Sequence, residues 1–90
     1  MVRYYILVEG RVQGVGFRFF SEVNAYNYNL TGWVKNLEND MVVLEVQGPE
    51  DNINKFILKI KEGNRFIRVD DIHIKRKDLL NNENTFRILY

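Results

Sequence analysis

The stretch from Gly10 to Arg18 constrains how this chain can fold more than any other part of the sequence. It joins an apolar run, residues 4–8, to a segment that has helical periodicity from Phe19 onward. Its glycines allow positive φ and a close approach of a ligand to the main chain, so successive backbone amides can converge on an anion. The helix start adds unpaired N–H groups and the positive end of its dipole, and Arg18 offers a planar cation that fits two phosphate oxygens. The stretch predicts an oxyanion-binding loop, and the alternative is a glycine-rich strand-to-helix connection with a surface arginine.

Apolar periodicity predicts the order of strands and helices. We expect strands at residues 3–9, 31–38, 41–47, 66–77 and 86–89, and helices at residues 19–28 and between Pro49 and Gly63. Asn39-Asp40 predicts a turn, because both residues tolerate left-handed backbone angles. This order is typical of an α+β fold, a ferredoxin-like βαββαβ sandwich that has an antiparallel sheet with two helices on one face and a short extra C-terminal strand. The length of 90 residues suffices for one modest core, so we expect residues 1–90 to form a single domain.

The same patterns predict which side chains face the core. The first helix is expected to bury a stripe of Phe19, Val23, Tyr26 and Leu30, with Phe17 and Phe20 anchoring the loop, and the second to bury Ile53, Phe56, Ile57 and Ile60. Alternation in the strand at 41–47 assigns Val42, Leu44 and Val46 to the core and Val43, Glu45 and Gln47 to a wet face. The strand at 66–77 is expected to point Ile72 and Ile74 inward and Asp71, His73 and Lys75 outward. The first strand is apolar on both faces, which predicts a central position.

Charge and composition exclude several classes of protein. A net charge of +1, from 13 basic and 12 acidic residues, is too balanced for a polyanionic partner, so we expect no binding to nucleic acid. The chain has no cysteine, which excludes disulfides and thiolate metal sites and fits a reducing compartment. No segment has the pattern of a signal peptide or the length of a membrane span. We therefore expect a cytoplasmic protein that binds no membrane, and a monomer as the default for so small a domain.

Two motifs resemble the signatures of a known family. Val8-Glu9-Gly10-Arg11-Val12-Gln13-Gly14-Val15-Gly16-Phe17-Arg18 resembles the first signature of the acylphosphatase family, and Gly32-Trp33-Val34-Lys35-Asn36, followed by Val42 and Gly48, resembles the second. The motifs occur in the family's order and separation, and the resemblance spans essentially the whole chain. The sequence departs from the family pattern at Asn39-Asp40, where Asp-Gly is usual, and at Gly63-Asn64, where Gly-Pro is common. These departures bear on turn geometry and stability rather than on chemistry.

The resemblance implies hydrolysis of the carboxyl–phosphate bond of a small acyl phosphate, which gives a carboxylate and inorganic phosphate. Arg18 would bind the phosphoryl oxygens. Asn36 would orient the attacking water, since a carboxamide accepts and donates hydrogen bonds but cannot act as a base. The backbone amides expected to hold the phosphate are those of Gln13, Gly14, Val15, Gly16, Phe17 and Arg18. A substrate oxygen is expected to take the proton, and no cofactor and no metal are expected. The structural alternatives are a strand-end asparagine bonded to a turn and a solvated arginine at a helix start.

Other residues and other functions are weaker candidates. Glu9 is expected to be an exposed strand-end acid, and Arg11 either adds to the field at the loop or is solvated. His73 is expected at the surface, without an acidic cluster that would suggest a metal site, and Asp70-Asp71 fails as a metal pair because adjacent strand residues point to opposite faces. The alternative functions are a phosphate-binding or carbamoyl-phosphate-processing module of the same superfamily and, less well supported, an RNA-binding module. The loop recognises the phosphate end of a substrate, and no motif recognises the acyl end.

Overall fold

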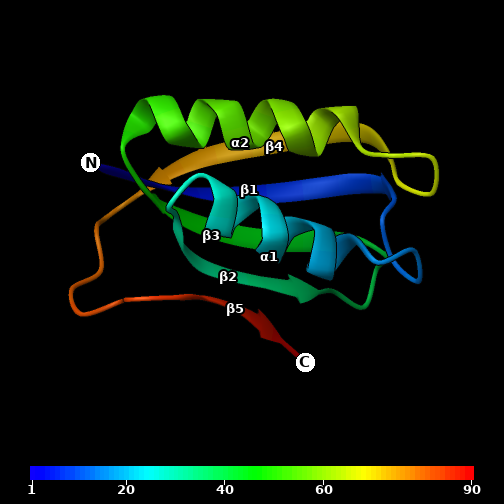
Figure 1. The fold of residues 1–90 in the computed structure, drawn as a ribbon. Helices are drawn as coiled ribbons and strands as arrows, with labels where there is room; N and C mark the ends of the chain where they lie inside the picture. The colour runs from blue at the N-terminus through cyan, green and yellow to red at the C-terminus, as the bar shows by residue number, and fades with distance from the viewer.

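The computed structural model describes residues 1–90 as one sheet with two helices (Figure 1). The strands are β1 (Val2–Arg11), β2 (Thr31–Asn36), β3 (Val42–Gly48), β4 (Arg68–Lys77) and β5 (Phe86–Leu89), and the helices are α1 (Phe17–Asn27) and α2 (Glu50–Glu62). The order in the sheet is β4-β1-β3-β2-β5. The first four strands pair antiparallel, and β5 adds parallel to β2 at the far edge. The predicted ferredoxin-like α+β sandwich is confirmed.

Strand β1 is an interior strand of the sheet, between β4 and β3, as its two apolar faces predict. Ile6 pairs with Leu44 of β3 on one side and with Ile74 of β4 on the other. Ile6 and Val8 are buried beneath the helices, whereas Leu7 on the opposite face is half-buried. Strand β1 therefore leads the chain from the interior of the sheet directly to the loop that precedes α1.

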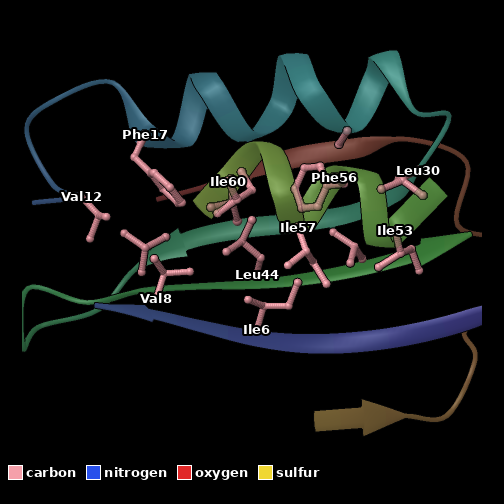
Figure 2. Close-up of a cluster of buried hydrophobic side chains, with 14 of the residues drawn as sticks. Ile6, Val8, Val12, Phe17, Leu30, Leu44, Ile53, Phe56, Ile57 and Ile60 are labelled. Carbon is pink, nitrogen blue, oxygen red and sulfur yellow. The ribbon is translucent and has the colours of Figure 1, made fainter. Parts of the chain in front are cut away.

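Both helices cover the same face of the sheet, α1 over β2 and β5 and α2 over β3 and β4 (Figure 1). The stripe predicted for α2 is confirmed, and it consists of Ile53, Phe56, Ile57 and Ile60. Figure 2 shows these side chains between the helix and the sheet. Burial of each such side chain contributes about 1.5–3 kcal/mol. Neither helix is long and apolar enough to cross a membrane.

Helix α1 buries a different face from the one predicted. The prediction is wrong for Phe19, Val23 and Tyr26, whose exposed fractions are 65%, 40% and 79%, and right for Leu30, which is buried after the helix. The buried face consists of Phe17, Ser21 and Ala25. Phe17 enters the core at the first residue of the helix, and a spacing of four residues then turns two small side chains toward the sheet. A search for large apolar residues overlooks such a face.

The sheet face opposite the helices is partly covered. The prediction of a wet face is wrong for Val43 and Gln47, which are 4% and 8% exposed. Residues 78–85, which connect β4 to β5, run past one end of this face. There the Leu80 amide donates to Gln47 Oε1 at 2.9 Å, and Gln47 Nε2 donates to the Leu80 carbonyl at 3.0 Å. Strand periodicity cannot reveal the cover of Gln47, because it comes from a distant segment of the chain.

Arg3 is a buried cation that holds the same segment in place. Its side chain is fully buried, its Nε donates to Glu45 Oε1 at 2.7 Å, and its Nη1 donates to Glu83 Oε1 at 2.8 Å. Nη1 also lies 3.2 Å from Gln47 Oε1. A buried guanidinium is tolerated only when acceptors satisfy its donors, as they do here. Arg3 thereby fixes the path that brings the chain to β5.

The two turns that depart from the family pattern are closed by asparagine side chains. Asn39 Oδ1 accepts a hydrogen bond from the Met41 amide at 3.2 Å, and Asp40 adopts a φ of 68°. Asn64 Oδ1 accepts from the Ile67 amide at 3.0 Å. The turn predicted at Asn39-Asp40 is confirmed, and both connections form without Asp-Gly or Gly-Pro.

Strand β4 is an edge strand and is less buried than predicted. Ile72 packs against the core, but Ile74, also predicted to point inward, is 45% exposed. An edge strand has a neighbour on one side only, so an inward orientation gives it less cover than a central strand receives. The outward residues Asp71, His73 and Lys75 are exposed as predicted.

We predict that Arg3→Ala lowers the free energy of unfolding by about 3 kcal/mol, because it leaves the mostly buried carboxylates of Glu45 and Glu83 without their cation. Arg68→Ala is the matched control, since the ion pair of Arg68 with Asp70 is mostly exposed, and it is expected to cost much less than Arg3→Ala. Urea unfolding measures both variants. Equal losses would contradict the role given to Arg3.

Candidate active site

Residues 12–16 connect β1 to α1 and form the loop in which the sequence predicts an oxyanion site. Val12 and Phe17 at its two ends are each 1% exposed, and Figure 2 shows both side chains at the same end of the core. Gly10, which the sequence places in the loop, belongs to β1 at a bulge. A Cβ there would lie 2.2 Å from the Arg68 carbonyl oxygen, so this glycine serves close strand packing rather than a ligand.

Gly14 and Gly16 give the loop a backbone that other residues adopt only with strain. Their φ values are 71° and 80°, in the left-handed region. A Cβ at either position would project into open space rather than into protein. Both glycines line a cleft in front of the loop, so their missing side chains leave room for a ligand to approach the backbone.

The backbone amides of the loop have no partners inside the protein. None of the amides from Gln13 to Phe19 donates a hydrogen bond to a protein atom, and the next one, that of Phe20, donates to the Gly16 carbonyl at 3.0 Å. No side chain caps α1, and its first turn holds no acidic residue. Consecutive free donors at the positive end of a helix make an environment suited to an oxyanion.

The cleft in front of the loop has a volume of about 200 Å³ and is lined by both Arg18 and Asn36. The guanidinium carbon of Arg18 lies 4.8 Å from the centroid of the Tyr90 ring, and Nη1 is 3.4 Å from the Leu89 carbonyl oxygen. Arg18 makes no other cation–π contact or side-chain hydrogen bond, and no carboxylate pairs with it. The cation is therefore oriented by the C-terminal strand but keeps its charge available to a ligand.

Asn36 ends β2 opposite Val42 of β3. Its Oδ1 is buried, and no protein group donates a hydrogen bond to it. An unpaired buried carbonyl oxygen is costly, so we expect a water or a ligand to donate a hydrogen bond to this atom. The alternative in which this oxygen accepts a bond from the turn is absent from the structure.

The side chain of Gln13 makes contacts that the sequence did not predict, since only its backbone amide was expected to act. Its Nε2 donates to the Leu37 carbonyl at 2.7 Å and to the Met41 carbonyl at 2.8 Å. Both carbonyls flank the turn between β2 and β3. The one available signal was a two-donor carboxamide within a glycine loop, but its partners follow only from the fold.

A larger groove of about 700 Å³ lies between α1 and residues 84–86. Its lining includes Glu22, Val23 and Tyr26 and contains no lysine or arginine. An oxyanion needs positive charge or free donors, so the smaller cleft beside Arg18 is the better site for it in spite of its size.

Glu9, Asp71 and His73 come together on the sheet face opposite the helices. His73 Nε2 lies 2.9 Å from Glu9 Oε2 and 3.3 Å from Asp71 Oδ2. The prediction that no acidic cluster surrounds His73 is wrong, because antiparallel pairing sets Glu9 of β1 beside Asp71 of β4. One ligand atom from each residue lies within 4.8 Å of the others, so the three could hold a cation. The Glu9 hydrogen bond, and then the Asp71 charge, raise the pKa of His73 above its ordinary value.

Comparison with known proteins points to a single family. The family model described as Acylphosphatase matches residues 4–88. An acylphosphatase of Clostridium acetobutylicum is 51% identical over 90 residues, which cover 100% of this chain and 99% of the relative. The crystal structure of the acylphosphatase from Bacillus subtilis matches with a TM-score of 0.94 and 40% identity over 100% of both chains. The crystal structure of HypF from T. kodakarensis matches 100% of this chain but only 12% of its own, with a TM-score of 0.87 and 34% identity.

The fold and the cleft define a class: ferredoxin-like sandwiches that present free backbone amides between their first strand and first helix. Within that class, the chain belongs to the acylphosphatase family. It is an enzyme, a hydrolase that acts on the acid-anhydride bond of acyl phosphates.

We predict that the stabilising effect of His73 depends on pH. Because the pKa of His73 is raised in the folded protein, the protonated form stabilises the fold fully below its ordinary pKa near 6.5, and this stabilisation is lost as pH rises through the folded-state pKa. The stability difference between the unchanged protein and His73→Gln should therefore be larger at pH 5.5 than at pH 8.5. Thermal unfolding at both pH values measures it, and a constant difference would contradict the prediction.

Proposed function

We propose that the loop amides from Gln13 to Arg18, the Arg18 guanidinium and the Asn36 carboxamide form the active site for hydrolysis of small acyl phosphates. The observation that carries this proposal is that Asn36, whose Oδ1 has no hydrogen-bond partner within the protein, lines the same cleft as Arg18 and the loop glycines. One cleft thus supplies free donors for a phosphoryl group and a free acceptor for a water.

In the proposed reaction, the loop amides and Arg18 hold the oxygens of the phosphoryl group and stabilise the charge that they carry in the transition state. The water oxygen attacks phosphorus while its O–H donates to Asn36 Oδ1. The bond between phosphorus and the carboxylate oxygen breaks, and the carboxylate leaves with the electron pair. The water proton passes to a phosphoryl oxygen, so the products are a carboxylate and inorganic phosphate.

Asn36 acts in this scheme by orientation rather than as a base. A carboxylate is a good leaving group, so the reaction needs little acid catalysis, and positioning with charge stabilisation supplies most of the acceleration. Catalysis without a metal or cofactor stays a prediction, as do a single domain over residues 1–90, a monomeric state, a cytoplasmic location and the absence of nucleic-acid partners.

A carbamoyl-phosphate-processing module, the alternative that the resemblance left open, is the second candidate. The match of this whole chain to a stretch of HypF equal to 12% of its length indicates that such a domain also occurs within a longer protein. Release of inorganic phosphate by the purified chain from acetyl, carbamoyl and benzoyl phosphate separates the two. Turnover of all three supports a free acylphosphatase. Turnover of carbamoyl phosphate alone would favour the second candidate, and turnover of none would overturn both.

We predict that Arg18→Lys lowers kcat/KM by about 100-fold or more and weakens inhibition by inorganic phosphate, because a point charge does not replace a planar fork of donors. Arg65→Lys is the matched control, since Arg65 also lies over an aromatic ring, that of Phe66, but outside the cleft. Steady-state kinetics measure both variants. Near-normal kinetics of Arg18→Lys would contradict the assigned role.

We predict that Asn36→Ala lowers kcat by about 100-fold while the inhibition constant of phosphate changes less than about threefold, because the variant loses the oriented water but keeps the loop. Its thermal stability should not fall, since Oδ1 has no hydrogen-bond partner to lose. Asn54→Ala on the exposed side of α2 is the control. Loss of phosphate binding together with kcat would assign Asn36 to the anion instead of the water.

A further inference from the structure

We propose that the side chain of Gln13 is a positioning residue for the reaction. It holds the end of the β2–β3 hairpin, and with it Asn36, at a set distance from the phosphate loop. The inference rests on the proposed role of Asn36 as the residue that orients the attacking water.

The two hydrogen bonds of Gln13 bind the residues that flank both strands of the hairpin next to Asn36. Leu37, whose carbonyl accepts at 2.7 Å, directly follows Asn36. Met41, whose carbonyl accepts at 2.8 Å, directly precedes Val42, the residue that pairs with Asn36 across the hairpin. One carboxamide NH₂ group thus ties the loop to the chain on either side of the Asn36–Val42 pair.

No other hydrogen bond joins the loop to this end of the hairpin. The Leu37 amide donates to the Met41 carbonyl at 2.9 Å, which closes the turn internally but does not connect it to the loop. The turn residues 38–40 are exposed, so packing does not hold them either. Gln13 itself is half-buried, which shields its bonds from competing water.

The position of Gln13 gives this link a chemical consequence. Its backbone amide belongs to the row of free donors proposed to bind the phosphoryl oxygens. Its side chain binds the end of the hairpin that carries Asn36, the residue proposed to orient the water. Gln13 would then contribute to both ends of the distance between phosphorus and the water oxygen, through its amide at one end and its side chain at the other. A displacement of about 1 Å between reacting groups can cost about 100-fold in rate.

Two variants test the proposal directly. Gln13→Met keeps the length and removes both donors, and it is expected to lower kcat by about 10- to 100-fold while KM and the phosphate inhibition constant change less than about threefold. Gln13→Asn keeps the amide but is one methylene shorter, so it reaches at most one carbonyl and is expected to lose less.

A control and a double variant separate positioning from stability. Asn52→Leu removes another carboxamide–carbonyl bond, from Asn52 Nδ2 to the Tyr28 carbonyl at 3.1 Å, away from the cleft. It is expected to lower the melting temperature and leave kcat unchanged. In the Asn36→Ala background, Gln13→Met should change kcat less than about threefold, because its effect passes through Asn36.

The outcomes are distinguishable. Full kcat in both Gln13 variants, or a loss that multiplies with that of Asn36→Ala, would overturn the positioning role. A rise in KM and in the phosphate inhibition constant at unchanged kcat would do the same, because it would place the effect on phosphate binding. Full kcat in Asn36→Ala alone would instead overturn the proposed function of Asn36.

Discussion

Burial of Val12 and Phe17, on either side of residues 13–16, is the constraint on which the candidate site depends. Both side chains sit in the core, so the backbone between them has to bend outward, and the left-handed angles of Gly14 and Gly16 make that bend possible. The same geometry leaves the amides without internal acceptors. The core therefore fixes the arrangement of these amide donors, which have no acceptor within the protein. In an isolated peptide the same amides would have no fixed arrangement.

Two arginines of this chain show how surroundings decide the role of a cation. Arg3 is fully buried and meets Glu45 and Glu83, so its charge is neutralised within the protein and its role is structural. Arg18 meets an aromatic ring and, at 3.4 Å, a carbonyl oxygen, so its charge is left for a ligand. The two are linked, because the segment held by Arg3 leads to β5 and thus to Tyr90 beside Arg18.

Local patterns in the sequence were sufficient for much of the architecture. The period of α2, its start after Pro49, the hairpin turn at Asn39-Asp40 and the last strand all depend on neighbouring residues, and all were predicted. The loop and its arginine could also be found, because glycine angles and helix starts are local properties. The resemblance to a family added Asn36, whose place at a strand end is unremarkable by itself.

What only the tertiary structure decided concerns segments far apart in the chain. Ser21 and Ala25, rather than Val23, face the sheet because Phe17 sets the phase of α1 from the core. The sequence by itself determined the elements, the loop and the residue types available for chemistry, since backbone preferences and periodicity act over a few residues. The fold decided which side chains meet, including Gln13 with the hairpin and Glu9 with His73, because such contacts depend on strand order and register, which no local pattern encodes.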